Sequence, residues 1–356
     1  MSSEQRQSQE AIYGLHEPVD VFDSLRVKAG NQKEVIRLFE TEYRPLAKER
    51  GLHWQGLWPL PPFERGQSTT ELLVHWRYPS LQALWQARGM EETDQRLPAF
   101  WSRIEALVES RTRKLGRPGG LMTGFRTEAE AVASGRPLAE GVQRYLAFVR
   151  PGASLSADEE SDWVVAAGEI DGVLTSYSGF NEGGWTFKPG EMTWDLSVSG
   201  AATAPSAEKL LGVLPGSAEI DEVVTLGECL DSGFRNPDLG EAVKRTIFLR
   251  TREDASPDAV RQMEEGLMEY ARLLPEMVNW VLSRVDAATG PVSWSHCFEQ
   301  EFASADHILG AYQNHPYHWA VVDRYFHPES HERAADAFSH TVRPIRRSVL
   351  AELMGP

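Results

Sequence analysis

The fold is decided by the stretch VKRTIFLRTREDASPDAVRQMEE, residues 243–265. Its first half alternates apolar and polar residues, which predicts a β-strand, and the Ser-Pro pair that follows ends the strand and starts a helix. The same order occurs twice earlier in the chain, in VDVFDSLRVKAGNQKEVIRLFE (19–40) and in VQRYLAFVRPGASLSADEESDW (142–163). The chain therefore carries three copies of one strand-then-helix pattern.

The middle of each copy also repeats, with a strand, a Ser or Pro start signal and a second helix. These stretches are TELLVHWRYPSLQALWQ from Thr70, MTWDLSVSGAATAPSAEKLLG from Met192 and SWSHCFEQEFASADHILGAYQ from Ser293. Shorter alternating runs precede two of them, LHWQGLW at Leu52 and VNWVLSRVD at Val278. The order strand, helix, strand, strand, helix, strand predicts an α+β fold of three tandem ferredoxin-like repeats, each an antiparallel sheet with helices on one face. We place them at 17–116, 138–235 and 241–351.

A sheet with helices on one face leaves the other face bare, and we expect that face to be rich in Trp, Phe, Leu and Val. Two such sheets paired face to face make a barrel-like sandwich of the dimeric α/β barrel type. Because three repeats cannot pair completely within one chain, we predict that the odd repeat pairs with a second copy, giving a homodimer.

Composition narrows the classes of partner. The formal net charge of −16 opposes binding to nucleic acid. No apolar run approaches the ~20 residues that span a bilayer, and the N-terminus lacks the apolar core of a secretory signal, so we expect a cytoplasmic protein that does not enter membranes. Cys229 and Cys297, the two cysteines, exclude a disulfide framework and a cysteine-rich metal site. No nucleotide-binding motif occurs.

The third repeat, over about residues 243–350, resembles the stress-responsive dimeric α/β barrel superfamily. The first repeat resembles the related NIPSNAP-type domains through VHWRYPSLQALWQ and LPAFWSRIEALVESRTRKLGRP. That superfamily includes cofactor-free cyclases, monooxygenases, haem enzymes and domains without known chemistry. Within it, the third repeat is similar to the olivetolic acid cyclases, which close a polyketide chain by aldol condensation without a cofactor.

This similarity implies site residues in AYQNHPYHW, residues 311–319. Tyr312 and His318 match the catalytic Tyr and His, and His315 matches the His between them. His296 matches a further cavity His on the third strand. Arg245 stands where those enzymes have another His, which suggests that it anchors an anionic or strongly polar group.

The residues themselves allow the same chemistry. Ser304 is a candidate N-cap for a helix over 305–313, and Pro316 suits the first position of a following helix. His318 then lies in that helix's first turn, where the dipole lowers the imidazole pKa and favours a neutral general base. Tyr312 can donate to a carbonyl oxygen as charge develops on it.

Each residue also has a purely structural reading. His315 can be a helix cap. His296 shares a strand face with Trp294 and Phe298, which forms either core or cavity wall.

The predicted substrate contacts are Trp294, Trp319 and His315. His327 and His331 are predicted to be solvated or capping groups, and His75 is not a second copy of His296. Residues 179–190 form either a lid or a long hairpin loop.

The sequence therefore predicts a cofactor-independent lyase or cyclase that binds no metal and acts on a phenolic or aromatic carbonyl compound. The chemistry is of the aldol or retro-aldol type, including loss of formaldehyde or carbon dioxide from lignin-like aromatics. His318 is the base, Tyr312 the donor, and His296 orients or shares the proton. Two alternatives stay open: a haem-dependent lyase resembling aldoxime dehydratases, and a noncatalytic small-molecule-binding or assembly protein.

Overall fold

A computed structural model describes residues 12–63, 68–126, 128, 141–151, 167–182, 191–199 and 218–353. The chain divides into two compact units. Unit 1 comprises Met1–Thr127, Ala255–Tyr270 and Leu309–Ala334, and unit 2 comprises Glu128–Asp254, Ala271–Ile308 and Ala335–Pro356. The domain bounds expected from the sequence stay predictions. Among the described helices, none is both long and apolar enough to cross a bilayer.

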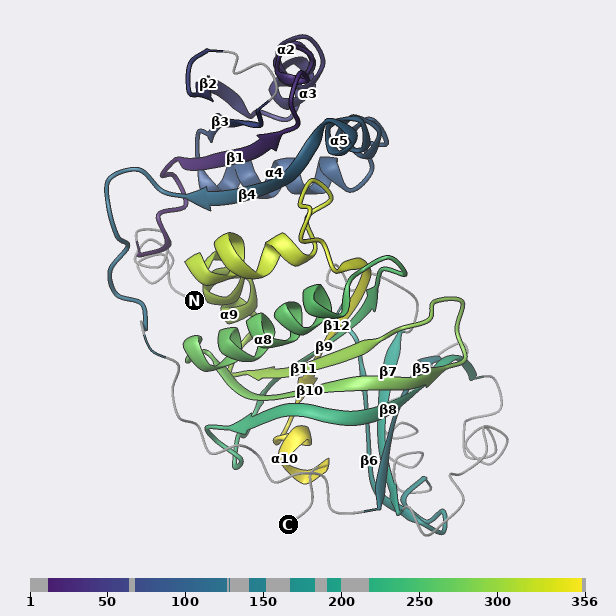
Figure 1. The fold of residues 1–356 in the computed structure, drawn as a ribbon. Helices are drawn as coiled ribbons and strands as arrows, with labels where there is room; N and C mark the ends of the chain where they lie inside the picture. Colours follow the sequence, from purple (N-terminus) through teal and green to yellow (C-terminus); the bar gives the residue numbers. More distant parts are fainter. Residues whose placement is uncertain are drawn as a thin grey trace. The chain divides into compact units, whose positions relative to one another are not determined.

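Unit 1 contains a 4-stranded antiparallel sheet in the order β2-β3-β1-β4. This is the strand order of a ferredoxin-like repeat, as the sequence predicts. The strands are β1 (Val19–Val27), β2 (His53–Leu60), β3 (Thr70–Tyr78) and β4 (Val108–Gly116). The helices are α2 (Gln32–Leu38), η1 (Phe39–Tyr43), α3 (Arg44–Glu49), α4 (Leu81–Glu91) and α5 (Arg96–Leu107), drawn with this sheet in Figure 1.

The helix-covered face of this sheet forms the core of unit 1. Alternate residues of β1, such as Val21 and Leu25, are buried together with Trp76 of β3 and with Phe39 and Phe100 from the helices. Ser80 caps α4, its hydroxyl oxygen accepting from the Ala83 N–H at 3.1 Å. The predicted Ser start signal therefore acts through a side-chain hydrogen bond.

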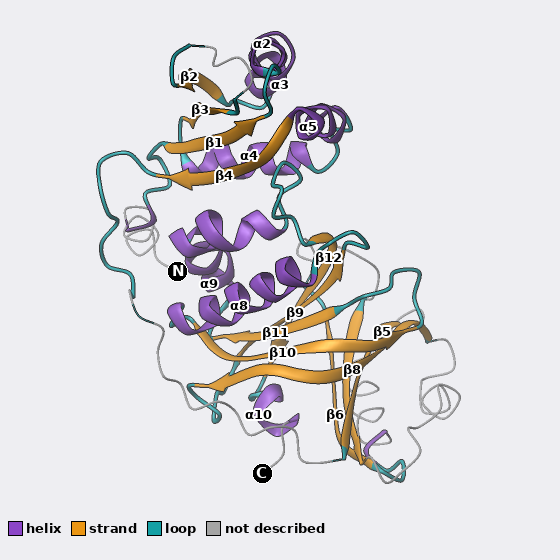
Figure 2. Ribbon diagram, in the orientation of Figure 1, coloured by secondary structure: helices purple, strands orange, loops and turns teal. Residues whose placement is uncertain are grey.

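Unit 2 contains an 8-stranded antiparallel sheet in the order β12-β9-β11-β10-β8-β5-β7-β6 (Figure 2). The order consists of two ferredoxin-like sheets, one from the second repeat and one from the third, joined where β10 pairs with β8. The second repeat supplies β5 (Val142–Arg150), β6 (Val173–Phe180), β7 (Met192–Ser199) and β8 (Glu219–Phe234). The third supplies β9 (Ala242–Thr251), β10 (Met277–Ala288), β11 (His296–Phe302) and β12 (Ala335–Ile345).

The two edges of this sheet meet. The Glu182 N–H, just after β6, donates to the Val342 carbonyl of β12 at 2.7 Å, and Arg343 Nη1 donates to the Ser178 carbonyl at 2.9 Å. The sheet therefore closes into a barrel-like sandwich, which confirms the predicted fold class. The predicted helices of the second repeat over 152–163 and 200–212, and residues 183–190 of the 179–190 loop, lie outside the described residues.

Charged side chains cross the middle of the barrel. Arg144 of β5 pairs with Glu299 of β11 at 2.8 and 2.9 Å. Lys244 of β9 pairs with Asp195 of β7 at 2.7 Å and with Glu299 at 2.9 Å, and Arg343 also pairs with Asp195. β5 and β11 are not neighbours in the sheet, and neither are β7 and β9, so these contacts span the interior.

The sequence analysis expects the bare face of each sheet to be apolar, and the structure corrects this for unit 2. The face that lines the barrel is apolar at one end, where Leu146, Phe148 and Phe248 cluster, and carries charged side chains in the middle. The second and third repeats each contribute a cation from the first strand and an anion from the third strand, and each cation pairs with the anion of the other repeat.

The remaining helices come from the third repeat. α8 is the long helix after β9, and the others are short segments after β11 and at the end of the chain. They are α8 (Pro257–Leu273), α9 (Ala305–His307), η2 (Ile308–Tyr312), η3 (His318–Val322), η4 (Asp323–Tyr325) and α10 (Val349–Leu353).

Candidate active site

A break between two helices carries the predicted catalytic residues. The first helix runs from Ala305 to Asn314, and Pro316 begins the next, as expected from the sequence. Asn314 ends the first helix by donating from Nδ2 to the carbonyls of Leu309 and Gly310, both at 2.9 Å. Ser304 has extended backbone geometry at the cap position, but its side chain makes no capping hydrogen bond. The predicted boundaries are therefore right, and the hydroxyl cap is wrong.

Hydrogen bonds define the neutral tautomers of the two histidines here. His318 Nδ1 lies 3.0 Å from the Gln313 carbonyl oxygen, which can only accept, so Nδ1 carries the proton and Nε2 the lone pair. His315 Nδ1 accepts from the Tyr317 N–H at 3.1 Å, so its proton is on Nε2. Burial, followed by repulsion from His318 when that ring is protonated, lowers the His315 pKa to about 4. His315 is neutral at pH 7 and caps the second helix.

Aromatic rings surround the His318 imidazole. The ring centroid of Tyr312 lies 4.9 Å from that of His318, and a stacked Tyr270 from α8 lies 5.6 Å from it. Trp85 of α4 is 5.4 Å away. Tyr270 also donates its hydroxyl to the Tyr312 carbonyl, which fixes the end of the first helix. A half-buried imidazole with a defined tautomer therefore sits beside a phenol that is 5% exposed.

Helix α4 contacts the segment after His318 at three-residue intervals, which places the contacting residues on one helix face. Trp85 meets His318, and Arg88 donates to the Asp323 carboxylate at 3.0 and 3.1 Å. Glu91 lies 3.3 Å from His327 Nε2. The first repeat thus positions the segment of the third repeat that follows His318.

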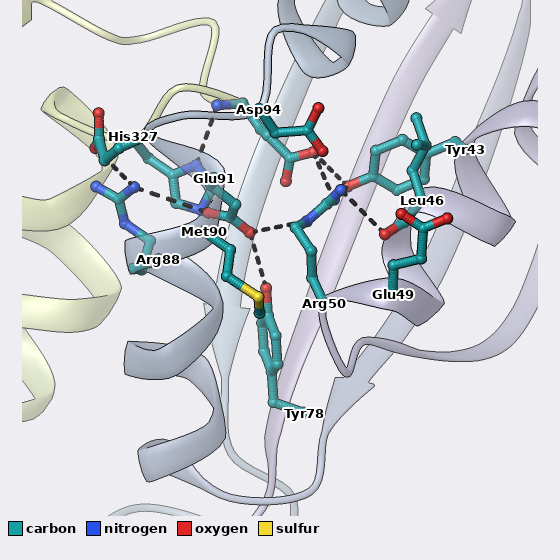
Figure 3. Close-up of polar contacts among 12 residues, drawn as sticks. Tyr43, Leu46, Glu49, Arg50, Tyr78, Arg88, Met90, Glu91, Asp94 and His327 are labelled. Carbon is teal, nitrogen blue, oxygen red and sulfur yellow. Dashed lines mark hydrogen bonds and ion pairs between the residues drawn. The ribbon is translucent and has the colours of Figure 1, made fainter.

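Glu91 is the centre of the buried contacts in Figure 3, where His327, Arg50 and Tyr78 all approach it. The Tyr78 hydroxyl donates to Glu91 at 3.2 Å, and Arg50 Nε lies 3.6 Å from the carboxylate. Burial, followed by the negative charge of Glu329, raises the Glu91 pKa to about 7. Burial and then the charges of Arg88, Arg113 and Arg50 hold the His327 pKa well below its ordinary value. At pH 7, His327 is therefore neutral, and Glu91 keeps its proton to a higher pH than a solvated glutamate does.

The sequence predicts His327 to be either solvated or capping, and the structure shows the second of these roles. His327 is buried, and its Nδ1 accepts from the Glu329 N–H at 3.1 Å, whereas His331 is exposed. The oxygen and nitrogen donors of Glu91, His327 and Glu329 lie within 4.8 Å of one another, close enough to consider a cation. The guanidinium groups of Arg50, Arg88 and Arg113 already pair with carboxylates of this cluster and disfavour another positive charge. This donor set suits an ion-pair network better than a metal ion.

The sequence predicts four further site residues. Trp319 is 3% exposed and belongs to the hydrophobic core of unit 1. Arg245, Trp294 and His296 are in unit 2. Arg245 Nη1 lies 3.4 Å from the Gln300 side-chain oxygen, and the Trp294 indole donates to Glu222 at 3.0 Å.

His296 is buried at the start of β11, 2.9 Å from the Ser295 hydroxyl. Sequence reasoning missed Trp85, Tyr270 and Glu91. The three-residue spacing of Trp85, Arg88 and Glu91 on one helix was the only local signal for that face.

Comparisons with known proteins give the family of one repeat. Residues 243–348 match the model of the Stress responsive A/B Barrel Domain. A comparison with curated proteins finds no match.

Among solved structures, a NIPSNAP family protein from Agrobacterium tumefaciens is 24% identical, covers 30% of this chain and 90% of its own, and has a TM-score of 0.25. A monooxygenase named as putative from Lactobacillus acidophilus is 12% identical and covers 57% of this chain and 93% of its own, with a TM-score of 0.37. A mutant chlorite dismutase from Candidatus Nitrospira defluvii is 10% identical, covering 65% and 96%, with a TM-score of 0.38. The family model confirms the expected resemblance, and over residues 243–348 the third repeat is a match to the stress responsive A/B barrel family.

Proposed function

We propose that this protein is a cofactor-independent lyase or cyclase whose active site is formed by His318 and Tyr312. The observation that carries the proposal is the bond from His318 Nδ1–H to the Gln313 carbonyl, because it leaves the lone pair of the neutral imidazole on Nε2. The adjacent Tyr312 phenol is the electrophilic partner. The proposed substrates are phenolic or aromatic carbonyl compounds, since the rings of Trp85 and Tyr270 flank the base.

The proposed aldol step needs these two groups alone. His318 Nε2 takes a proton from the carbon next to a carbonyl, and the resulting enolate carbon bonds to a second carbonyl carbon. Negative charge develops on that second oxygen, which accepts a hydrogen bond from the Tyr312 hydroxyl. The imidazolium then returns its proton to the alkoxide. The reverse sequence releases an aldehyde, including formaldehyde. With a para-hydroxyl group, the same base takes the phenol proton and delivers it to the ring carbon that bears the carboxylate, and loss of carbon dioxide returns the electron pair to the ring as the phenolate. The roles of His296 and Arg245 stay predictions.

A substrate panel tests this proposal. Purified protein is incubated with phenolic β-hydroxy ketones and phenolic acids, and released aldehyde or carbon dioxide is measured. We expect His318→Ala and Tyr312→Phe each to lower turnover by roughly 10²–10⁴-fold, the usual contribution of acid-base catalysis. His53→Ala, on exposed β2, is the matched control and should leave turnover unchanged. Full activity in both site variants would end the assignment. A Soret band in the absorption spectrum would instead favour the haem-dependent alternative.

We also propose that the first repeat pairs with a second copy of the chain. The face of its sheet opposite the helices exposes Trp58 at 44% and carries Phe22 stacked on His75, with ring centroids 4.5 Å apart. Asp20 lies on the first strand of this face and Arg77 on the third, 2.7 Å apart. An acid on one strand and a base on another are self-complementary across a two-fold axis. We expect Trp58→Lys to convert a dimer to a monomer in sedimentation velocity. A monomeric wild-type protein would exclude this pairing.

A further inference from the structure

The first repeat encloses one carboxylate with donors from four of its own segments. Tyr43 of η1 donates its hydroxyl to Glu329 Oε1 at 2.8 Å, and the Trp101 indole of α5 donates to the same oxygen at 3.2 Å. Arg50, after α3, reaches it at 3.1 Å, and Arg113 of β4 binds Oε2. Glu329 itself belongs to the third repeat and is 0% exposed. All of these donors therefore belong to the first repeat, and the carboxylate that accepts their hydrogen bonds belongs to the third.

The donors are held in place without help from Glu329. Arg113 is fixed by Asp23, through bonds of 2.7 and 2.9 Å, and by the Tyr43 oxygen at 2.8 Å. Arg50 donates to the Leu46 carbonyl at 3.1 Å. The Tyr43 ring packs against Trp76, Phe100 and Trp101, with centroids 5.0, 4.8 and 5.3 Å away. A donor set fixed in this way by its own repeat is preorganised for an anion and loses little entropy on binding one.

The geometry of the donors also specifies what they bind. The two guanidinium groups and the indole can only donate, and the Tyr43 hydroxyl donates its hydrogen while its oxygen accepts from Arg113. These donors bind the two oxygens of one planar carboxylate. Arg111 Nη1 additionally donates to the Glu329 backbone carbonyl at 2.6 Å, which holds the segment rather than the side chain. The chemistry selected is that of a small monocarboxylate.

We propose that the first repeat contains a carboxylate-binding site formed by Tyr43, Arg50, Trp101 and Arg113, and that Glu329 fills it as a tethered ligand of the chain's own. Removing the Glu329 side chain then opens a site for a free carboxylate. Glu329→Ala deletes Cγ and the carboxyl group, and acetate consists of the same atoms. The site is independent of the catalytic assignment, because neither His318 nor Tyr312 takes part in it.

The test is rescue of stability by an added anion. Breaking a buried, paired charge costs enough to lower the melting temperature of Glu329→Ala by roughly 12 °C. Acetate at about a hundredfold excess over its dissociation constant should recover roughly 8 °C of that loss. Acetamide, which has the same shape without the charge, and sodium chloride at equal ionic strength should recover almost none. Formate, which lacks the methyl group, should recover less than acetate.

Two variants control the result. Glu42→Ala removes a carboxylate that pairs with Arg103 on the surface, and acetate should not change its melting temperature beyond the wild-type response. Glu329→Asp keeps the charge, so it should respond to acetate less than Glu329→Ala does. If Glu329→Ala does not fold in chloride, refolding yield in acetate against acetamide gives the same readout. Equal effects of acetate and acetamide, or of acetate on Glu329→Ala and Glu42→Ala, would overturn the proposal.

Discussion

Replacing Glu299 by Gln tests whether the charges inside the barrel stabilise the fold. The substitution keeps the volume of the side chain and removes the charge that pairs with Arg144 and Lys244. Burial raises the Glu299 pKa, but the opposing charges of Arg144 and Lys244 outweigh it, so that the pKa falls from 4.5 to about 2. At about 1.36 kcal/mol per pKa unit, this lowering corresponds to about 3 kcal/mol of stability.

The known cost of breaking a buried ion pair gives a similar value for the stability lost in Glu299→Gln. Removing one partner of a buried ion pair costs about 3–5 kcal/mol, because the remaining charge stays buried without compensation. Here Arg144 would lose both of its bonds of 2.8 and 2.9 Å, while Lys244 would keep Asp195. We therefore expect a loss of about 3 kcal/mol at pH 7, seen as a melting temperature roughly 10 °C lower.

The dependence on pH has a definite sign. Because the folded pKa of Glu299 lies below the unfolded value, its contribution is present above about pH 4.5 and disappears as the pH falls towards 2. The difference between wild type and Glu299→Gln should shrink accordingly. Urea unfolding at pH 7 and at pH 3, followed by circular dichroism, measures both values.

A surface pair provides the control. Glu265 lies 3.2 Å from Arg261, and both side chains are more than half exposed, so Glu265→Gln should cost less than about 0.5 kcal/mol. A loss below about 1 kcal/mol for Glu299→Gln at pH 7 would show that burial of these charges costs as much as their pairing returns. A loss that is the same at pH 7 and pH 3 would refute the role of ionisation.

Three further predictions concern Glu91 and two glycines. Because the folded pKa of Glu91 is raised to about 7, its contribution to the free energy of unfolding is lost as the pH rises through that value. The free energy of unfolding of Glu91→Gln should therefore rise relative to wild type by up to about 3 kcal/mol between pH 5 and pH 8. Melting curves at both pH values measure this gain, and an unchanged difference would contradict it. A Cβ on Gly233 would overlap the Trp280 ring, so Gly233→Ala should destabilise by about 1–3 kcal/mol. Gly89, in α4, has open space, and Gly89→Ala should stabilise by about 1 kcal/mol in the same unfolding assay.

The fold was predictable because its signals are local. Alternation in three strand-then-helix stretches, with turn residues between them, led to the ferredoxin-like strand order within each repeat. The pairing of β10 with β8, which joins two repeats into one sheet, has no local signal. The break at Asn314 and Pro316 was equally local, since proline restricts the residue before it. The hydroxyl cap at Ser304 failed because cap geometry does not guarantee the hydrogen bond.

The buried charges could not be predicted in this way. Alternation shows which strand residues share a face, and a polar face is normally read as solvent-exposed. Closure of the barrel turns the face of Lys244 and Glu299 inward, and closure depends on contacts across the whole of unit 2. Glu91 and His327 are likewise far apart in sequence, so no window that contains His327 shows its partner. The roles of Tyr312, His318, His296 and Arg245 stay predictions from the sequence.

The arrangement of cations and anions inside the barrel has a consequence for how three similar repeats find their correct partners. In the second and third repeats the base is on the first strand and the acid on the third, as Arg144 and Asp195 show. The first repeat reverses this polarity, with Asp20 on its first strand and Arg77 on its third. If it took the place of either repeat in the barrel, Asp20 would replace a first-strand cation and would face the anion of the other repeat, Glu299 or Asp195. During synthesis, when the first repeat emerges before its neighbours, this repulsion disfavours the wrong pairing.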